Sequence, residues 1–250
     1  MNKNNFVTYK LFGQFKNLLA FTTTKKSIPV MVPRFTGDSE KVFANNRKLL
    51  AGALGVGQNQ LIFPRQTHTN NVVEVLKIPE TEIENCDALI TNQPGICICV
   101  QTADCVPILL FDPVNKVIAA IHAGWRGTVK KIVAVAIAKM VVGYNSSPGN
   151  ILATVGTSIG PDVYEVGYEV VNAVQKTIPN SEKTLHRNNA GKYHFDLWEA
   201  NRQILLESGV RSGNIEITGE CSFAKSDKYF SARRDGIETG RMVTGIMLNL

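Results

Sequence analysis

The stretch Val100–Thr128, VQTADCVPILLFDPVNKVIAAIHAGWRGT, decides the fold and carries the most reactive side chains of the chain. Its apolar runs VPILLF and VIAAI flank the turn-forming DPVNK, a pattern that predicts two buried strands joined by a turn. Cys105 stands at the start of the first strand and His122 at the end of the second. The glycine-flanked GWRGT then opens a helical pattern. A thiol and an imidazole therefore meet where α/β proteins place their ligands, at strand ends beside a helix start.

The rest of the chain extends this pattern without a linker or an internal repeat. The 250 residues are 44% apolar and 19% charged, which suits one folded domain over residues 1–250. Strands are expected at 18–24, 87–91, 151–155, 215–218 and 242–249, and helices at 130–142, 167–177 and 196–209. A further helix begins at Asp38 or Ser39 and ends near Leu54. We therefore predict an α/β (α+β) fold with one mixed central sheet flanked by helices.

Local signals sharpen some of these boundaries. Asp196 with Glu199 three residues later is a helix start signal. The polar segment 181–192 reads as an exposed loop. Cys97 and Cys99 share one strand face and are expected to be inert core residues.

Charge and targeting features exclude several classes of protein. The net charge of +6 comes from scattered residues, which favours small anionic substrates over a nucleic-acid surface. The longest apolar run, IVAVAIAKMVV, is short and contains Lys139, so no membrane association is expected. No secretory signal is visible, and five cysteines without a CxxC pair favour reduced thiols in a cytoplasmic protein. No obligate protein partner is evident.

His68, in the polar turn QTHTNN, completes a candidate metal set with Cys105 and His122. Zinc binds nitrogen and thiolate ligands, and catalytic sites keep three protein ligands with one open position. The spacing by itself leaves an alternative, in which Cys105 and His122 form a nucleophilic pair. GTSIG around Ser158 matches the nucleophile elbow of hydrolases, but Gly160-Pro161 prevents an immediate helix, so we interpret it as a turn.

The segment SFAKSDKYFSARRDGIETGR, residues 222–241, combines arginines with aromatic residues. Such a loop suits an anionic or heteroaromatic ligand, and we expect it to form a wall of the site, an ordinary polar loop being the alternative. Gly127 and Thr128 at a helix start offer N–H groups to phosphate, with Arg126 beside them as a bidentate donor. Asp104, next to Cys105, is expected either to carry a proton or to orient its neighbour.

Several motifs together resemble a known family. These motifs are QTHTNN, DALIT, TADCVPILLFDP, AAIHAGWRGT, IGPDVYEVGYEV, FDLWEANR, ARRDG and TGRM. Between Arg47 and the C-terminus the chain looks like the laccase-domain proteins, also called polyphenol oxidase-like or peptidoglycan editing factor proteins. TADCVP followed by HAGWRG is the most specific part of the match.

The resemblance implies an α/β domain like the catalytic domain of cytotoxic necrotizing factors. It also implies a metal, usually zinc with copper possible, held by His68, Cys105 and His122. The implied activity is phosphorolysis of adenosine, inosine and methylthioadenosine, with adenosine deamination alongside. The substrates would then be purine nucleosides and phosphate, and the NNR segment makes Arg47 a basic candidate for binding them.

One departure concerns the N-terminal part. Family members carry an arginine and a Gly-Gly-Val-Ser-like loop after the first strand, whereas this chain continues as TTTKKSIPVMVPRFTGDSE. The resemblance therefore does not fix the substrate.

Other functions stay open at this point. A multicopper oxidase needs many more histidines than the four present, so laccase chemistry is not expected. A cysteine hydrolase or amidase acting on a peptidoglycan precursor, with Cys105 as nucleophile, is the main alternative. A non-catalytic metal-binding protein is a further one.

Overall fold

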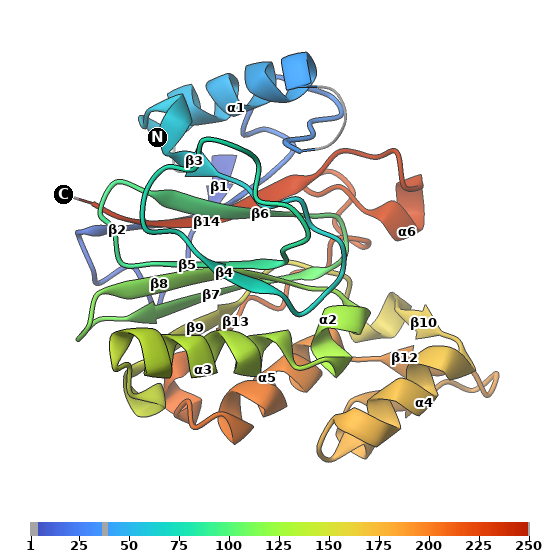
Figure 1. Cartoon of the computed structure of the whole chain (residues 1–250). Coiled ribbons are helices and arrows are strands. Elements are labelled where there is room, and N and C mark those ends of the chain that lie inside the picture. The colour runs from blue at the N-terminus through green and yellow to red at the C-terminus, as the bar shows by residue number, and fades with distance from the viewer. Residues whose placement is uncertain (1–4, 37–39, 250) are drawn as a thin grey trace.

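Two sheets lie face to face between helices in the computed structural model, which describes residues 5–36 and 40–249 (Figure 1). The first sheet has five strands in the order β1-β2-β14-β6-β3. Their bounds are Phe6–Val7, Leu18–Thr23, Met242–Leu248, Cys97–Thr102 and Leu61–Ile62. β14 is antiparallel to both β2 and β6, so the last strand of the chain lies at the centre of this sheet.

The second sheet has six strands in the order β13-β9-β7-β8-β5-β4. Their bounds are Ile215–Ile217, Leu152–Val155, Val106–Asp112, Val117–Ala123, Ala88–Thr91 and Val72–Glu74. β7 and β8 form the hairpin predicted from the sequence, with Pro107 paired to His122. A small third sheet, β10-β12-β11, contains Glu165–Val166, Tyr193–Phe195 and Leu185–Arg187.

Helices cover the outer faces of the two large sheets (Figure 1). α1 (Glu40–Leu54) lies over the five-stranded sheet, whereas α3 (Ile132–Tyr144) and α5 (Leu197–Glu207) lie under the six-stranded one. The remaining α-helices are α2 (Trp125–Val129), α4 (Tyr168–Thr177) and α6 (Ala232–Asp235). Single 3₁₀ turns span Gln58–Gln60, Pro148–Asn150, Pro161–Val163, Ser181–Lys183 and Ser212–Asn214.

The period-2 pattern explains why β7 and β8 are buried throughout. Ile108 and Ile121 belong to the core under α3 and α5. Leu109 and Ala120 point the other way, into the core shared with the five-stranded sheet. Strands covered on both faces read as continuous apolar runs, as these two do.

The expectation of one central sheet is wrong, because the strands divide between two packed sheets. Both sheets present apolar residues on both faces, so the sequence pattern of a strand does not reveal which sheet contains it. The mixed α/β class itself is correct. The likeness to cytotoxic necrotizing factor domains stays a prediction.

Smaller differences have local causes. Residues 181–192, expected as a loop, include β11, which pairs with β12. The helix expected from residue 130 begins at Ile132, because Lys131 adopts a left-handed φ of 54° between α2 and α3. The capping by Asp38 or Ser39 lies outside the described residues, whereas Asp196 caps α5 by accepting from the Glu199 N–H. Within the described ranges, no helix has the length and apolar character to cross a membrane.

The close packing of Cys99 and Phe21 against Gly245 of β14 can be tested by substitution. A Cβ built there would lie 2.8 Å from both Cys99 Sγ and Phe21 Cζ, whereas one at Gly213 would meet nothing within 4 Å. We expect Gly245→Ala to lower the free energy of unfolding by about 1–3 kcal/mol, as overpacked cores do. Gly213→Ala should change it by less than about 0.5 kcal/mol. Urea unfolding of the two variants measures both changes in the free energy of unfolding. Equal changes would contradict the close packing at Gly245.

Candidate metal centre

The three predicted metal ligands meet at one end of the six-stranded sheet. His68 lies in the loop between β3 and β4, Cys105 in the turn before β7, and His122 in β8. One donor atom from each lies within 4.8 Å of the others, and the two imidazole rings are 4.9 Å apart. His122 is buried, Cys105 is partly buried and His68 is exposed. The group is therefore open on the side of His68.

The geometry of this group fits a metal ion. Cys105 Sγ lies 3.9 Å from His68 Nε2. Ligands of tetrahedral zinc at ordinary Zn–S and Zn–N lengths are about 3.6 Å apart. Gly124 leaves the necessary room, because a Cβ there would lie 2.9 Å from Cys105 Sγ and 3.2 Å from His68 Cδ2. The donor set of one thiolate and two imidazoles suits zinc and also copper.

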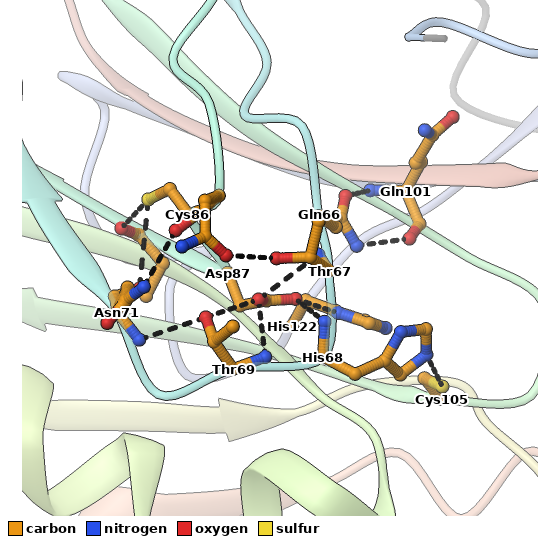
Figure 2. Close-up of polar contacts among 12 residues, drawn as sticks. Gln66, Thr67, His68, Thr69, Asn71, Cys86, Asp87, Gln101, Cys105 and His122 are labelled. Atoms are coloured by element: carbon orange, nitrogen blue, oxygen red, sulfur yellow. Dashed lines mark hydrogen bonds and ion pairs between the residues drawn. The ribbon is translucent and has the colours of Figure 1, made fainter.

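The buried carboxylate of Asp87 holds the turn that carries His68 (Figure 2). It accepts hydrogen bonds from the backbone N–H groups of Thr67, His68 and Thr69 at 3.3, 3.0 and 2.7 Å, and from the Thr69 hydroxyl at 2.7 Å. This wrapping supports the left-handed φ of 61° at His68, which a non-glycine residue rarely adopts. His68 is thus presented by a turn folded around one acid.

Asp87 also orients His122. His122 Nδ1 lies 2.8 Å from Asp87 Oδ1. Because the carboxylate accepts there, Nδ1 carries the proton and Nε2 remains for a ligand bond, as in carboxylate–histidine–zinc sites. The sequence analysis did not single out Asp87 as a site residue. Its only signal was its place at the start of the DALIT motif.

The pKa values of the three side chains reflect their mutual charges. Burial raises the pKa of the Cys105 thiol, but His122 and His68 outweigh burial and bring it down to about 6. Burial lowers the pKa of His122, yet Cys105 and Asp87 raise it to about 9. Burial also opposes ionisation of Asp87, but its bonds to His122 and Thr69 hold its pKa well below the usual range. Cys105 is therefore a thiolate at neutral pH.

Asp104 lies beside the metal ligands but is fully engaged elsewhere. Its carboxylate accepts from Ser222 Oγ at 2.6 Å, Ser231 Oγ at 3.0 Å and the Arg233 N–H at 2.7 Å. It adopts a left-handed φ of 89° and is buried. Between the two roles expected from the sequence, these bonds favour orientation of the surrounding loop over proton transfer.

The helix start after His122 offers less to an anion than expected. The Thr128 N–H donates to Gly124 O at 2.8 Å, and its hydroxyl accepts from Asn201 Nδ2 at 3.1 Å. Gly127 is buried with Thr128. The Arg126 guanidinium lies 4.4 Å from the Trp125 ring centroid and 3.9 Å from Glu169. Of the three residues expected to bind phosphate, Arg126 is therefore the exposed one.

Arg47 lies on α1, in a separate cavity. Its Nε donates to Phe35 O at 2.7 Å, and its Nη2 lies 3.6 Å from Glu82. The cavity has a volume of about 920 Å³, and Phe63 and Ile78 also line it. None of the three metal-ligand candidates is among its described lining residues. A substrate role for Arg47 stays a prediction.

The loop 222–241 does border the metal centre, as expected. Arg233 lies over the Tyr164 ring, 5.2 Å from its centroid. Burial raises the pKa of Tyr164, and the Cys105 charge raises it further while Arg233 and Arg126 act in the opposite direction. Tyr164 was missed in the sequence analysis, although it lies in the IGPDVYEVGYEV motif. Its contact with Arg233 joins Tyr164 to the loop 222–241.

Other predicted residues lie away from this centre. Cys97 and Cys99 are buried in the core, as expected. Ser158 is buried, and its Oγ accepts from Trp198 Nε1 at 2.5 Å. His186 and His194 face each other across β11 and β12 in the small sheet. Only two of the four histidines therefore belong to the metal centre.

A mixed α/β domain with an open His-Cys-His group defines the class of protein. The chain belongs to the family described as multi-copper polyphenol oxidoreductase laccase, whose model matches residues 32–249. It is 35% identical to a purine nucleoside phosphorylase of Bacteroides thetaiotaomicron, covering 96% of this chain and 95% of that one. It is 41% identical to the adenosine deaminase RL5 of an unknown prokaryotic organism, covering 91% and 92%.

Solved structures agree with this assignment. YlmD from Geobacillus stearothermophilus superposes with a TM-score of 0.91 at 27% identity, covering 100% of this chain and 98% of that one. The Bacillus licheniformis protein YfiH gives 0.89 at 28% identity, covering 99% and 97%. The similarity thus spans the whole domain.

Zinc affinity should depend on pH in a defined way. Binding must release the His122 proton below pH 9 and the Cys105 proton below pH 6. We expect log K for zinc to rise by about one per pH unit between pH 6 and 9, more steeply below pH 6, and to level off above pH 9. Competition with a chelating dye measures this; a flat profile between pH 6 and 8 would contradict the assignment.

Gly124→Ala should empty the metal centre without unfolding the domain, because its Cβ would collide with Cys105 Sγ. Gly167→Ala is a matched control: both glycines are helix N-caps with extended backbone, and a Cβ at Gly167 meets nothing within 4 Å. We expect bound zinc, measured by plasma emission spectrometry, to fall at least tenfold in the first variant only. Full zinc content in Gly124→Ala is the outcome that argues against this site.

Proposed function

We propose that the protein is a metal-dependent purine nucleoside enzyme. It would phosphorolyse adenosine, inosine and methylthioadenosine to the free base and ribose 1-phosphate or methylthioribose 1-phosphate, and would also deaminate adenosine. The carrying observation is the open group of His68, Cys105 and His122, whose donor atoms lie within 4.8 Å of one another. Relatives named purine nucleoside phosphorylase and adenosine deaminase, each similar over nearly the whole chain, support the same reading.

Zinc is the metal we propose, with copper as a possible occupant of the same N and S donors. Zinc in such a site supplies a Lewis acid and brings the pKa of water toward neutrality. Asp87 keeps the His122 proton on Nδ1, so that Nε2 stays available as a ligand atom. None of the five cysteines forms a disulfide in the structure, which suits the cytoplasmic location that we propose.

The two reactions place different demands on the residues around the metal. Deamination adds water at the purine C6 and releases ammonia, so it needs a nucleoside and water alone. Phosphorolysis breaks the bond between C1′ and the base nitrogen; a phosphate oxygen bonds to C1′, and the departing base takes up a proton. It therefore needs an anion site beside the ribose. Trp125 and Tyr164, with Arg126 and Arg233 over their rings, would face the nucleoside.

Laccase activity is not proposed, despite the name of the family. The four histidines of the chain are too few for blue and trinuclear copper centres, and two of them lie in the small sheet. A single metal bound by His68, Cys105 and His122 leaves no basis for four-electron reduction of oxygen.

One observation favours a second candidate. The pKa of Cys105 is lowered to about 6, and its Sγ lies 3.9 Å from His68 Nε2, an arrangement that also suits a nucleophilic thiolate. The protein would then be a cysteine hydrolase or amidase acting on a peptidoglycan precursor.

A product assay separates these functions. Zinc-loaded protein is incubated with adenosine, with and without phosphate, and the products are separated by chromatography. We expect inosine in both cases, and adenine with ribose 1-phosphate only when phosphate is present. Cys105→Ser and chelated wild-type protein should each lose at least 100-fold in rate, in line with loss of a metal ligand or metal. If zinc-loaded protein turns over no nucleoside, the proposal is refuted. If hydrolysis persists in the presence of the chelator, a nucleophilic cysteine is favoured.

A further inference from the structure

Two arginines from distant parts of the chain converge on one carbonyl group. Arg34 Nη2 donates to Ile237 O at 2.8 Å, and Arg241 Nη2 donates to the same oxygen at 2.9 Å. Two donors on one acceptor oxygen lie about 5 Å apart. The structure therefore holds two positive charges side by side, which repel each other.

The ion pair that Arg34 makes is screened by solvent. Arg34 lies 3.1 Å from Glu238, whose side chain is 87% exposed, so solvent screens this ion pair strongly. The other Arg241 side-chain bonds go to the carbonyl oxygens of Thr239 and Gly240. Among the side chains of residues 5–36 and 41–249, no carboxylate forms an ion pair with Arg241. Burial and the Arg34 charge lower the pKa of Arg241, whereas the charges of Cys105, Glu238 and Asp104 act in the opposite direction.

The pair lies at the same end of the five-stranded sheet as the corner that carries Cys105. Met242 pairs with Thr102 across β14 and β6. Arg241 comes directly before Met242, and Asp104 and Cys105 follow shortly after Thr102. The Arg241 N–H donates to Pro33 O, which brings the Arg34 segment to the same place. The pair therefore lies near the turn that carries Asp104 and Cys105.

Other arginines near the metal centre are less suited to bind an anion. Arg126 lies over the Trp125 ring, 4.4 Å from its centroid, and the Thr128 N–H beside it already donates to Gly124 O. Arg234 differs from Arg241 in making two bonds to a carboxylate, that of Asp235. Arg233 Nη1 donates to Glu165 O, and this arginine has no second cation in contact with it among the described residues. Arg34 and Arg241, by contrast, share one carbonyl oxygen, that of Ile237.

We propose that Arg34 and Arg241 bind inorganic phosphate, the second substrate of the phosphorolysis on whose proposal this inference rests. A phosphate dianion neutralises both charges and accepts charge-assisted N–H bonds from the two guanidinium groups. Glu238 competes for Arg34 when phosphate is absent.

Calorimetric titration of the full chain with inorganic phosphate, metal-free and zinc-loaded, tests this site. Arg34→Met should weaken phosphate binding at least tenfold, as the loss of a charge-assisted contact does. Glu238→Gln should tighten binding two- to threefold, a gain that misfolding does not produce. Arg187→Met is the control for the loss of one arginine charge, because Arg187 lies in β11 of the small sheet, over the Tyr193 ring and away from the Arg34–Arg241 pair. It should leave the dissociation constant unchanged.

Three outcomes would overturn the site: no phosphate binding by wild-type protein, an unchanged dissociation constant in Arg34→Met, or a loss confined to Arg126→Met. Far-UV circular dichroism checks that each variant is folded. The two proposals fail separately. Arg34-dependent phosphate binding without nucleoside cleavage would leave this site standing and refute phosphorolysis, whereas phosphorolysis with an unaltered phosphate KM in Arg34→Met would refute this site alone.

Discussion

The carboxylate of Asp87 is the contact on which the metal centre depends. It accepts three backbone N–H groups of the His68 turn and also contacts His122 Nδ1. Two imidazoles that lie far apart in the sequence are thereby fixed to one buried acid. Removing such an acid would leave several N–H groups and a histidine without partners, which costs more than a single surface contact. The position of both ligands follows from this one side chain.

Asp104 plays a corresponding part on the other side of Cys105. Its bonds to Ser222, Ser231 and the Arg233 N–H tie the loop after β13 to the turn that carries the thiolate. The ligands are therefore supported by two separate acids, and neither acid needs to move during a reaction. Preorganisation of this kind is what a precise metal site requires, because orientation of the ligands sets their affinity.

The two-sheet architecture explains why these groups lie at one end. β7 and β8 are buried on both faces, so polar side chains are confined to their ends. The turn before β7 and the end of β8 meet there, beside α2 and the small sheet (Figure 1). The basic residues of the N- and C-terminal segments come to the same region because β14 lies between β2 and β6. A chain with scattered charge thus gains a local positive region.

The sequence by itself determined the buried hairpin, most helices, the absence of a multicopper histidine set and the three metal-ligand candidates, because periodicity and ligand chemistry are local properties. Only the tertiary structure decided that the strands form two sheets, since apolar runs look alike in either. It also decided that Asp87 supports both histidines and that the Thr128 N–H donates to Gly124 O. It likewise brought Arg34 and Arg241 to the same carbonyl oxygen. Each of these depends on contacts between segments distant in sequence, which no local pattern encodes.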